Sequence, residues 1–160
     1  MNNKAFTLIE ILVAVLIIGI LAAIAVPQYK VAVTRTKYIR LMQIVDTLWR
    51  GQQDYFLANG TYATKLDALD ISLPPGYETQ GSDITYDWVS CTNSATNSNG
   101  PRVYCSMLDG ALEYSRLYGE QGRGCNAYRK KSQYALAYRV CNSIGKWSNG
   151  NSTADYFTVF

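Results

Sequence analysis

The sequence predicts an α+β protein in which one long N-terminal helix, residues 6–58, packs against a β-rich head, residues 59–160. Three observations support this prediction. The run Phe6–Val26 is apolar and carries a single charged residue, Glu10. Apolar side chains then recur every three or four residues as far as residue 55, which is the period of a helix. The remainder alternates short β-type runs with Gly, Asn and Ser clusters and holds all four cysteines, as expected of a small disulfide-stapled head.

The first half of the helix, residues 6–26, has the length of a membrane-spanning segment. Its 21 residues would extend about 31 Å at about 1.5 Å per residue, close to a hydrocarbon core of about 30 Å. Residues 1–5 form a short polar leader that contains Lys4. A cation on the short side favours its retention in the cytoplasm, so we expect the bulk of the chain to be translocated.

Three interpretations of this segment compete. A secretory signal peptide could be cleaved after Ala25, because Ala23-Ile24-Ala25 has small residues at the required spacing. A plain signal anchor would keep Met1 as its N-terminus. Neither explains Glu10, since a carboxylate in an apolar helix costs about 2.5–3.5 kcal/mol on insertion scales. A third interpretation gives this carboxylate a role.

The residues Ala5-Phe6-Thr7-Leu8-Ile9-Glu10, after a short leader with a lysine, resemble the processing site of type IV prepilins. The resemblance continues through Gly19 and Val26-Pro27 and covers about the first 58 residues. It implies that a dedicated peptidase cuts between Ala5 and Phe6 and methylates the new N-terminal Phe6. The family usually has Gly before the cut, where this chain has the equally small Ala5.

The resemblance also implies a function: a structural subunit of a type IV pilus, held in the inner membrane by one span with its head in the periplasm. It would then polymerise into a homo-oligomeric helical filament on the cell surface, with the prepilin peptidase/methyltransferase and the pilus assembly machinery as partners. Glu10 would meet the Phe6 amine of a neighbouring subunit; the alternative is that this carboxylate snorkels to the headgroups. Three other functions remain open: a type II secretion pseudopilin, a signal-anchored binding module and a secreted enzyme.

The second half of the helix, residues 27–58, is amphipathic. Pro27 removes a backbone donor and predicts a kink, and Asn59-Gly60 predicts the end of the helix. The stripe that should face the head comprises Val31, Tyr38, Leu41, Val45, Leu48, Gln52 and Tyr55. The residues expected to face away from it are Arg35, Lys37, Arg40, Asp46 and Arg50.

Within the head we expect two short helices, four strands and one long loop. A capping box of Thr64 and Asp67 would start a helical turn at 65–70, and Ser132 and Gly145 would begin and end a helix at 132–144. The expected strands are 84–90, 102–108, 112–118 and 156–159, and the expected loop is 93–100.

The four cysteines, Cys91, Cys105, Cys125 and Cys141, predict two disulfides in an oxidising compartment. Buried free thiols in a cytosolic protein are the alternative. Four cysteines allow three connectivities, and we favour Cys91–Cys105 with Cys125–Cys141 because each pair closes a short local loop.

The composition argues against catalysis. The chain has no histidine, so the commonest general base and metal ligand are absent, and we expect no catalytic, cofactor or metal site. The spaced carboxylates Asp67/Asp70 and Asp83/Asp87 are interpreted as structural. Thirteen tyrosines suggest carbohydrate adhesion or charge conduction, but half-exposed packing on a sheet explains them more simply. A net charge of +3 indicates no specific nucleic-acid partner.

Overall fold

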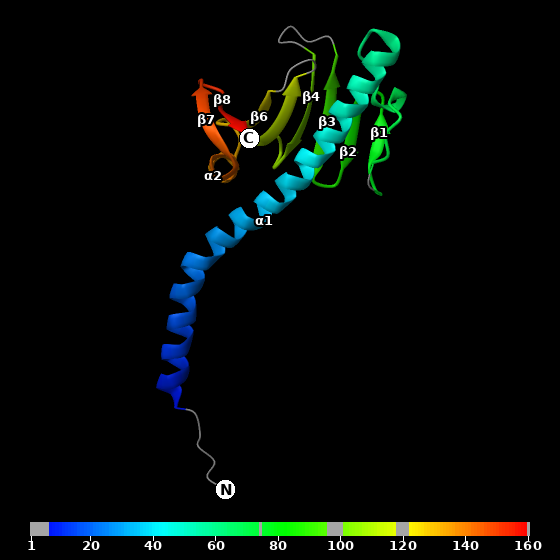
Figure 1. Ribbon diagram of the computed structural model, residues 1–160. Helices are drawn as coiled ribbons and strands as arrows, with labels where there is room; N and C mark the ends of the chain where they lie inside the picture. Colours follow the sequence, from blue (N-terminus) through cyan, green and yellow to red (C-terminus); the bar gives the residue numbers. More distant parts are fainter. Residues whose placement is uncertain (1–6, 74, 96–100, 118–121, 160) are drawn as a thin grey trace.

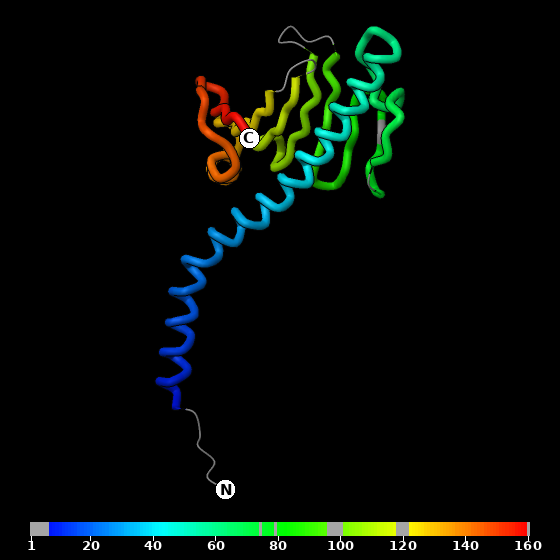
Figure 2. The backbone as a smooth tube through the Cα atoms, in the orientation of Figure 1, coloured from blue at the N-terminus to red at the C-terminus, as the bar shows by residue number. Residues whose placement is uncertain are grey.

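Helix α1 runs from Leu8 to Asn59 in the computed structural model, which describes residues 7–73, 75–95, 101–117 and 122–159. Gly60 ends the helix with φ 72°, and its N–H donates to the Phe56 carbonyl oxygen at 2.8 Å. Glycine suits this left-handed position because it has no Cβ. The first half of α1 projects away from the head, and the helix axis bends between the two halves (Figures 1 and 2). Both helix bounds agree with the expected ones to within two residues.

An eight-stranded antiparallel sheet forms most of the head, in the order β1-β2-β3-β4-β5-β6-β8-β7. All strands but the last two are therefore in chain order, and β8 inserts between β6 and β7. The strands are β1 Glu78–Gln80, β2 Asp83–Tyr86, β3 Val89–Ser94, β4 Arg102–Met107, β5 Leu112–Leu117, β6 Arg123–Tyr128, β7 Gly145–Gly150 and β8 Ala154–Val159.

The second half of α1 crosses the sheet, and the short helix α2, Tyr134–Ile144, packs beside β6 at the other end (Figure 1). The core lies between these helices and the sheet. Tyr38, Leu41, Val45 and Leu48 from α1 are fully buried there, as the amphipathic stripe predicted. The fold is therefore the expected α+β arrangement of one long helix on an antiparallel sheet.

The expected strand 84–90 was wrong, because the chain turns at Asp87 and Trp88 and forms β2 and β3 instead. No Gly or Pro marks this turn. Strands β1, β6 and β7 were not expected at all. The expected loop 93–100 begins too early, since Asn93 is buried in β3 and donates to the Ala63 carbonyl oxygen at 2.6 Å; residues 96–100 lie outside the described residues.

Two expected caps do not form. Only a three-residue turn, η1 Leu66–Ala68, lies at 65–70, and no side chain caps it. Helix α2 begins after Gln133 rather than Ser132, again without a side-chain cap. Gly145 has extended backbone, φ −143°, because the chain passes directly from α2 into β7.

Candidate assembly surface and the head that carries it

The first half of α1 is apolar, and the head does not cover it. Every residue from 7 to 30 is exposed, including Leu8 at 80% and Ile24 at 66%. By length and composition this helix could cross a membrane. Soluble helices bury an apolar stripe on one side, whereas a helix that is apolar all round is surrounded by lipid or by other protein. The head, packed against the second half only, leaves this surface available.

Thr7 and Glu10 form a capping box at the start of α1. The Glu10 carboxylate accepts hydrogen bonds from the Thr7 N–H at 2.9 Å and from the Thr7 hydroxyl at 2.8 Å. The Glu10 N–H in turn donates to the Thr7 hydroxyl oxygen at 3.4 Å. The box satisfies backbone donors that have no partner inside the helix. Its signature, Thr followed three residues later by Glu, was present in the sequence, but we had expected a box only at Thr64.

The predicted cleavage site, Ala5 and Phe6, lies outside the described residues. Pro27 lies inside α1, and the residues on both sides of it remain helical. Its missing N–H and its ring disturb one turn of the helix, and the bend of α1 falls in the stretch that contains it (Figure 2). The kink expected from Pro27 is therefore a bend within a continuous helix.

An ion pair between Asp46 of α1 and Arg116 of β5 fixes the second half of the helix on the sheet, with Nη1 and Oδ1 2.9 Å apart. We had expected Asp46 to face away from the head, and this expectation was wrong. The Arg116 guanidinium also lies 3.8 Å from the centre of the Trp49 ring. Burial, followed by the neighbouring Asp46 carboxylate, raises the pKa of Tyr114 to about 12, so its hydroxyl stays protonated beside this pair.

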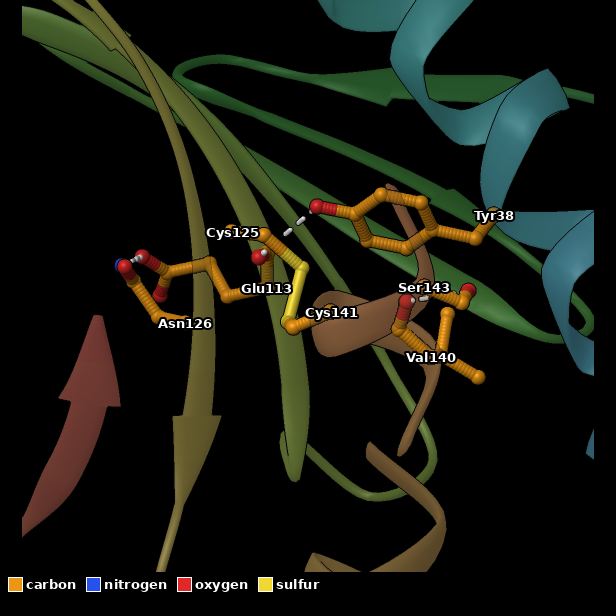
Figure 3. Close-up of a disulfide and its surroundings, with 7 residues drawn as sticks. All are labelled: Tyr38, Glu113, Cys125, Asn126, Val140, Cys141 and Ser143. Carbon is orange, nitrogen blue, oxygen red and sulfur yellow. Dashed lines mark hydrogen bonds between the residues drawn. A yellow bond between two sulfur atoms is a disulfide. The ribbon is translucent and has the colours of Figure 1, made fainter. Parts of the chain in front are cut away.

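Both favoured disulfides are confirmed. Cys91–Cys105 joins β3 to β4 at residues that are directly opposite in the sheet. Cys125–Cys141 joins β6 to α2, and Figure 3 shows it beside Tyr38, whose hydroxyl donates to the Glu113 carbonyl oxygen at 3.3 Å. Burial raises the pKa of Tyr38 well above its ordinary value. This region therefore ties α1, α2 and the sheet together.

The buried carboxylate of Asp155, in β8, accepts three hydrogen bonds. Arg129 donates twice, from Nε at 3.0 Å and from Nη2 at 2.6 Å, and the Tyr134 hydroxyl donates at 2.6 Å. The Arg129 guanidinium is the main reason that the pKa of Asp155 is lowered. The cluster joins α2 to β8 and explains how a carboxylate is tolerated there.

Within the described ranges, no group of three or more Cys, Asp or Glu side chains is placed to hold a metal ion. Two of the suspected carboxylates, Asp83 and Asp87, lie at the start of β2 and in the turn that follows it. Several tyrosines fill the core or stack on one another, such as Tyr77 on Tyr86 with ring centres 4.7 Å apart. These contacts are structural, as the simpler interpretation of the tyrosines expected.

A long helix with a bare apolar half and a disulfide-stapled sheet at its other end defines a class of proteins: membrane-anchored subunits that assemble through the helix. The model of the prokaryotic N-terminal methylation motif matches residues 1–26, which include Ala5, Phe6 and Glu10. The chain is 56% identical over 134 residues to a type IV major fimbrial protein FimA of Dichelobacter nodosus, covering 71% of this chain and 81% of that protein. The chain belongs to the type IV pilin family.

Other relatives match over shorter stretches. A fimbrial protein of Pseudomonas aeruginosa is 53% identical over 75 residues, which cover 47% of this chain and 49% of that protein. The chain therefore spans about half the length of that relative. A type IV major pilin protein PilA of Myxococcus xanthus is 38% identical over 62 residues, 39% of this chain and 28% of that protein. No solved structure is significantly similar to the chain.

Proposed function

We propose that this protein is the structural subunit of a type IV pilus. One observation carries the proposal: residues 8–26 are apolar on every face apart from the single carboxylate of Glu10, and the head covers none of them. Such a surface needs lipid around it before assembly and copies of itself afterwards. The same segment thus serves two successive states, a membrane span in the precursor and a packed helix in the fibre.

The proposed order of events follows from the chain. The precursor spans the inner membrane once, with residues 1–5 in the cytoplasm and the head in the periplasm, where both disulfides can form. The prepilin peptidase/methyltransferase cleaves after Ala5 and methylates Phe6. The pilus assembly machinery then adds the mature subunit to the fibre, and Glu10 meets the Phe6 amine of a neighbour. The bend at Pro27 lets the head lie at an angle to the packed helices.

The relatives described above are fimbrial and pilin proteins, which favours a pilus over a secretion pseudopilin. The two disulfides and the eight-stranded head support the same choice, since a subunit exposed outside the cell benefits from covalent links. A signal-anchored binding module would need the apolar segment but would have no use for the processing motif that precedes it.

The mature N-terminus tests the proposal. Intact-mass analysis and N-terminal sequencing of fibres sheared from cells should find a chain that begins at N-methylated Phe6. A small residue before the cut should suffice, so Ala5→Gly should be processed normally, whereas the bulky Ala5→Leu should accumulate as uncleaved precursor. A mature chain that starts at Met1 would support a plain anchor, and one that starts at Val26 a secreted protein; either result rejects the proposal.

A further inference from the structure

The part of α1 that follows the apolar segment is strongly basic. Between residues 27 and 45 the chain has four cations, Lys30, Arg35, Lys37 and Arg40, and no acid. All four side chains are exposed. Among the described residues none of them forms an ion pair. Lys37 lies 5.9 Å from the centre of the Trp88 ring and lines a pocket that also contains Asp87 and Asp109. In the part of the chain that the structure describes, none of this charge is therefore held in a salt bridge.

The positions of these cations along the helix match the surface of a bilayer that α1 spans up to Val26. At about 1.5 Å per residue, Lys30 lies about 6 Å, Arg35 about 13 Å and Lys37 about 16 Å beyond Val26. The headgroup layer adds about 5–7 Å to each side of the hydrocarbon core, and electrostatic attraction persists for about 8 Å more. Long Lys and Arg side chains also reach back toward the interface. Arg40, at about 21 Å, lies beyond this range.

The cations of the proposed membrane contact lie on two sides of the helix. Lys30 and Lys37 are seven residues apart and share a face, whereas Arg35 is five residues beyond Lys30 and points about 140° away from it. A protein partner docks on one face of a helix, but a layer of lipid headgroups encloses it. Tyr29 is 70% exposed and directly precedes Lys30. An aromatic residue at this position is typical of a membrane interface.

These cations lie on the side of the membrane to which the head is translocated. Their position opposes the general bias of membrane insertion, which keeps Lys and Arg in the cytoplasm. We propose that Lys30, Arg35 and Lys37 form a cationic collar that binds anionic phospholipid headgroups while the subunit is in the membrane. The proposal rests on the membrane-held precursor with a translocated head. Each subunit must exchange these headgroups for other surroundings when it enters the fibre, so anionic lipid retains unassembled subunits in the membrane.

The test uses the full-length chain in bilayers that mix phosphatidylglycerol with phosphatidylcholine. After mild detergent extraction, mass spectrometry measures the ratio of the two lipids that stay bound. Each cation near an anionic surface favours binding by about fivefold, so the wild-type protein should retain phosphatidylglycerol at least about fivefold above its bulk ratio. The collar variant Lys30→Gln/Arg35→Gln/Lys37→Gln should retain the two lipids in their bulk ratio.

Two control variants make the result specific. Lys130→Gln/Lys131→Gln/Lys146→Gln removes the same charge from exposed positions of the head and should keep the wild-type lipid ratio. Lys30→Arg/Arg35→Lys/Lys37→Arg keeps the collar charge and should do the same. Normal disulfides and circular dichroism in each variant would verify that the head is folded.

Three results would overturn the collar: no enrichment of phosphatidylglycerol by the wild-type protein, undiminished enrichment by the collar variant, or an equal loss in the head control. Loss of fibres by a collar variant whose lipid ratio is unchanged would assign these cations to contact with a second subunit instead. Failure of the pilus proposal is separate, because it shows in the mature N-terminus and in the fibres of the wild-type protein rather than in bound lipid.

Discussion

Arg116 of β5 pairs with Asp46 of α1 across the boundary between helix and sheet, with 2.9 Å between Nη1 and Oδ1. The two side chains are only 7% and 25% exposed. The pair attaches the helix, which carries the apolar segment, to the head. Loss of this pair should therefore loosen the contact between the head and α1 without changing the apolar segment, residues 8–26.

We predict that Asp46→Ala lowers the free energy of unfolding of the head by about 3 kcal/mol, because it leaves the buried Arg116 cation without its carboxylate. The exposed Asp54, just over two turns further along α1, provides the matched control, and Asp54→Ala should change the free energy of unfolding by no more than about 0.5 kcal/mol. Urea titration of the full-length protein in detergent, followed by near-ultraviolet circular dichroism, measures both. Equal effects would show that the ion pair contributes nothing.

The two disulfides should differ in what they hold in place. Their sequence separations are 14 and 16 residues, so chain entropy gives each about 3 kcal/mol. Cys91 and Cys105 are already aligned by the ladder of β3 and β4, whereas Cys125–Cys141 is the covalent link of α2 to the sheet. In Cys125→Ala/Cys141→Ala, the amides of α2 should exchange with deuterium faster, by hydrogen-exchange mass spectrometry.

The matched variant Cys91→Ala/Cys105→Ala should leave the amides of β3 and β4 protected, because the strand hydrogen bonds remain. Fast exchange in β3 and β4 together with unchanged exchange in α2 would reverse this assignment.

Asp155 should make the head sensitive to acid. Hydrogen bonds from Arg129 lower the pKa of Asp155 in the folded state, below about 3.9 in the unfolded chain. The resulting stabilisation is complete above the unfolded value and is lost as the pH falls through the folded one. Asp155→Asn should therefore be less stable than wild type at neutral pH, and the difference should shrink below about pH 4. Urea midpoints measured across this range test the prediction, and a difference that is constant with pH would contradict it.

The helix and its buried face could be predicted from the sequence because they depend on local spacing. A 3.6-residue period placed Tyr38, Leu41 and Leu48 against the head, and Gly60 marked the end of α1. Asp46 was wrongly expected to face away from the head, because the spacing of apolar residues does not reveal the partner of a charged residue. Only the fold brings Arg116, 70 residues away along the chain, to that carboxylate.

The missed strands β6 and β7 lack the alternation of buried apolar and exposed residues that identifies a strand: β7 has no buried residue, and β6 buries Cys125, Asn126 and Ala127 in succession. In β6, Asn126 is buried because it donates to the Glu113 carboxylate of β5 at 2.8 Å, and the Tyr128 hydroxyl donates to the same group at 2.9 Å. These contacts between strands replace the apolar alternation that identifies a strand. The turn at Asp87 and Trp88 likewise has no local signature, because the aromatic contacts of Tyr86 and Trp88 form only in the folded head.

Glu10 has two roles that can be tested separately. One is structural, in the capping box with Thr7 at the start of α1, and the other is the proposed pairing with the Phe6 amine of a neighbour. Glu10→Gln keeps the first, since glutamine serves equally well at the third position of a capping box, and removes the charge that the second needs. Thr7→Val does the reverse, with a loss of about 1 kcal/mol in helix capping.

If the charge drives assembly, Glu10→Gln should abolish most fibres while Thr7→Val keeps most of them. An amine and a carboxylate at about 4 Å attract by roughly 4 kcal/mol at an effective dielectric constant of about 20, which exceeds the contribution of the cap. Electron microscopy of cells that express only the variant counts the fibres, and immunoblots verify that mature subunit is present in the membrane. A carboxylate that only snorkels to the headgroups predicts wild-type fibre numbers for Glu10→Gln. Loss of fibres in Thr7→Val but not in Glu10→Gln would assign the whole effect to the capping box, because only that variant removes the hydroxyl.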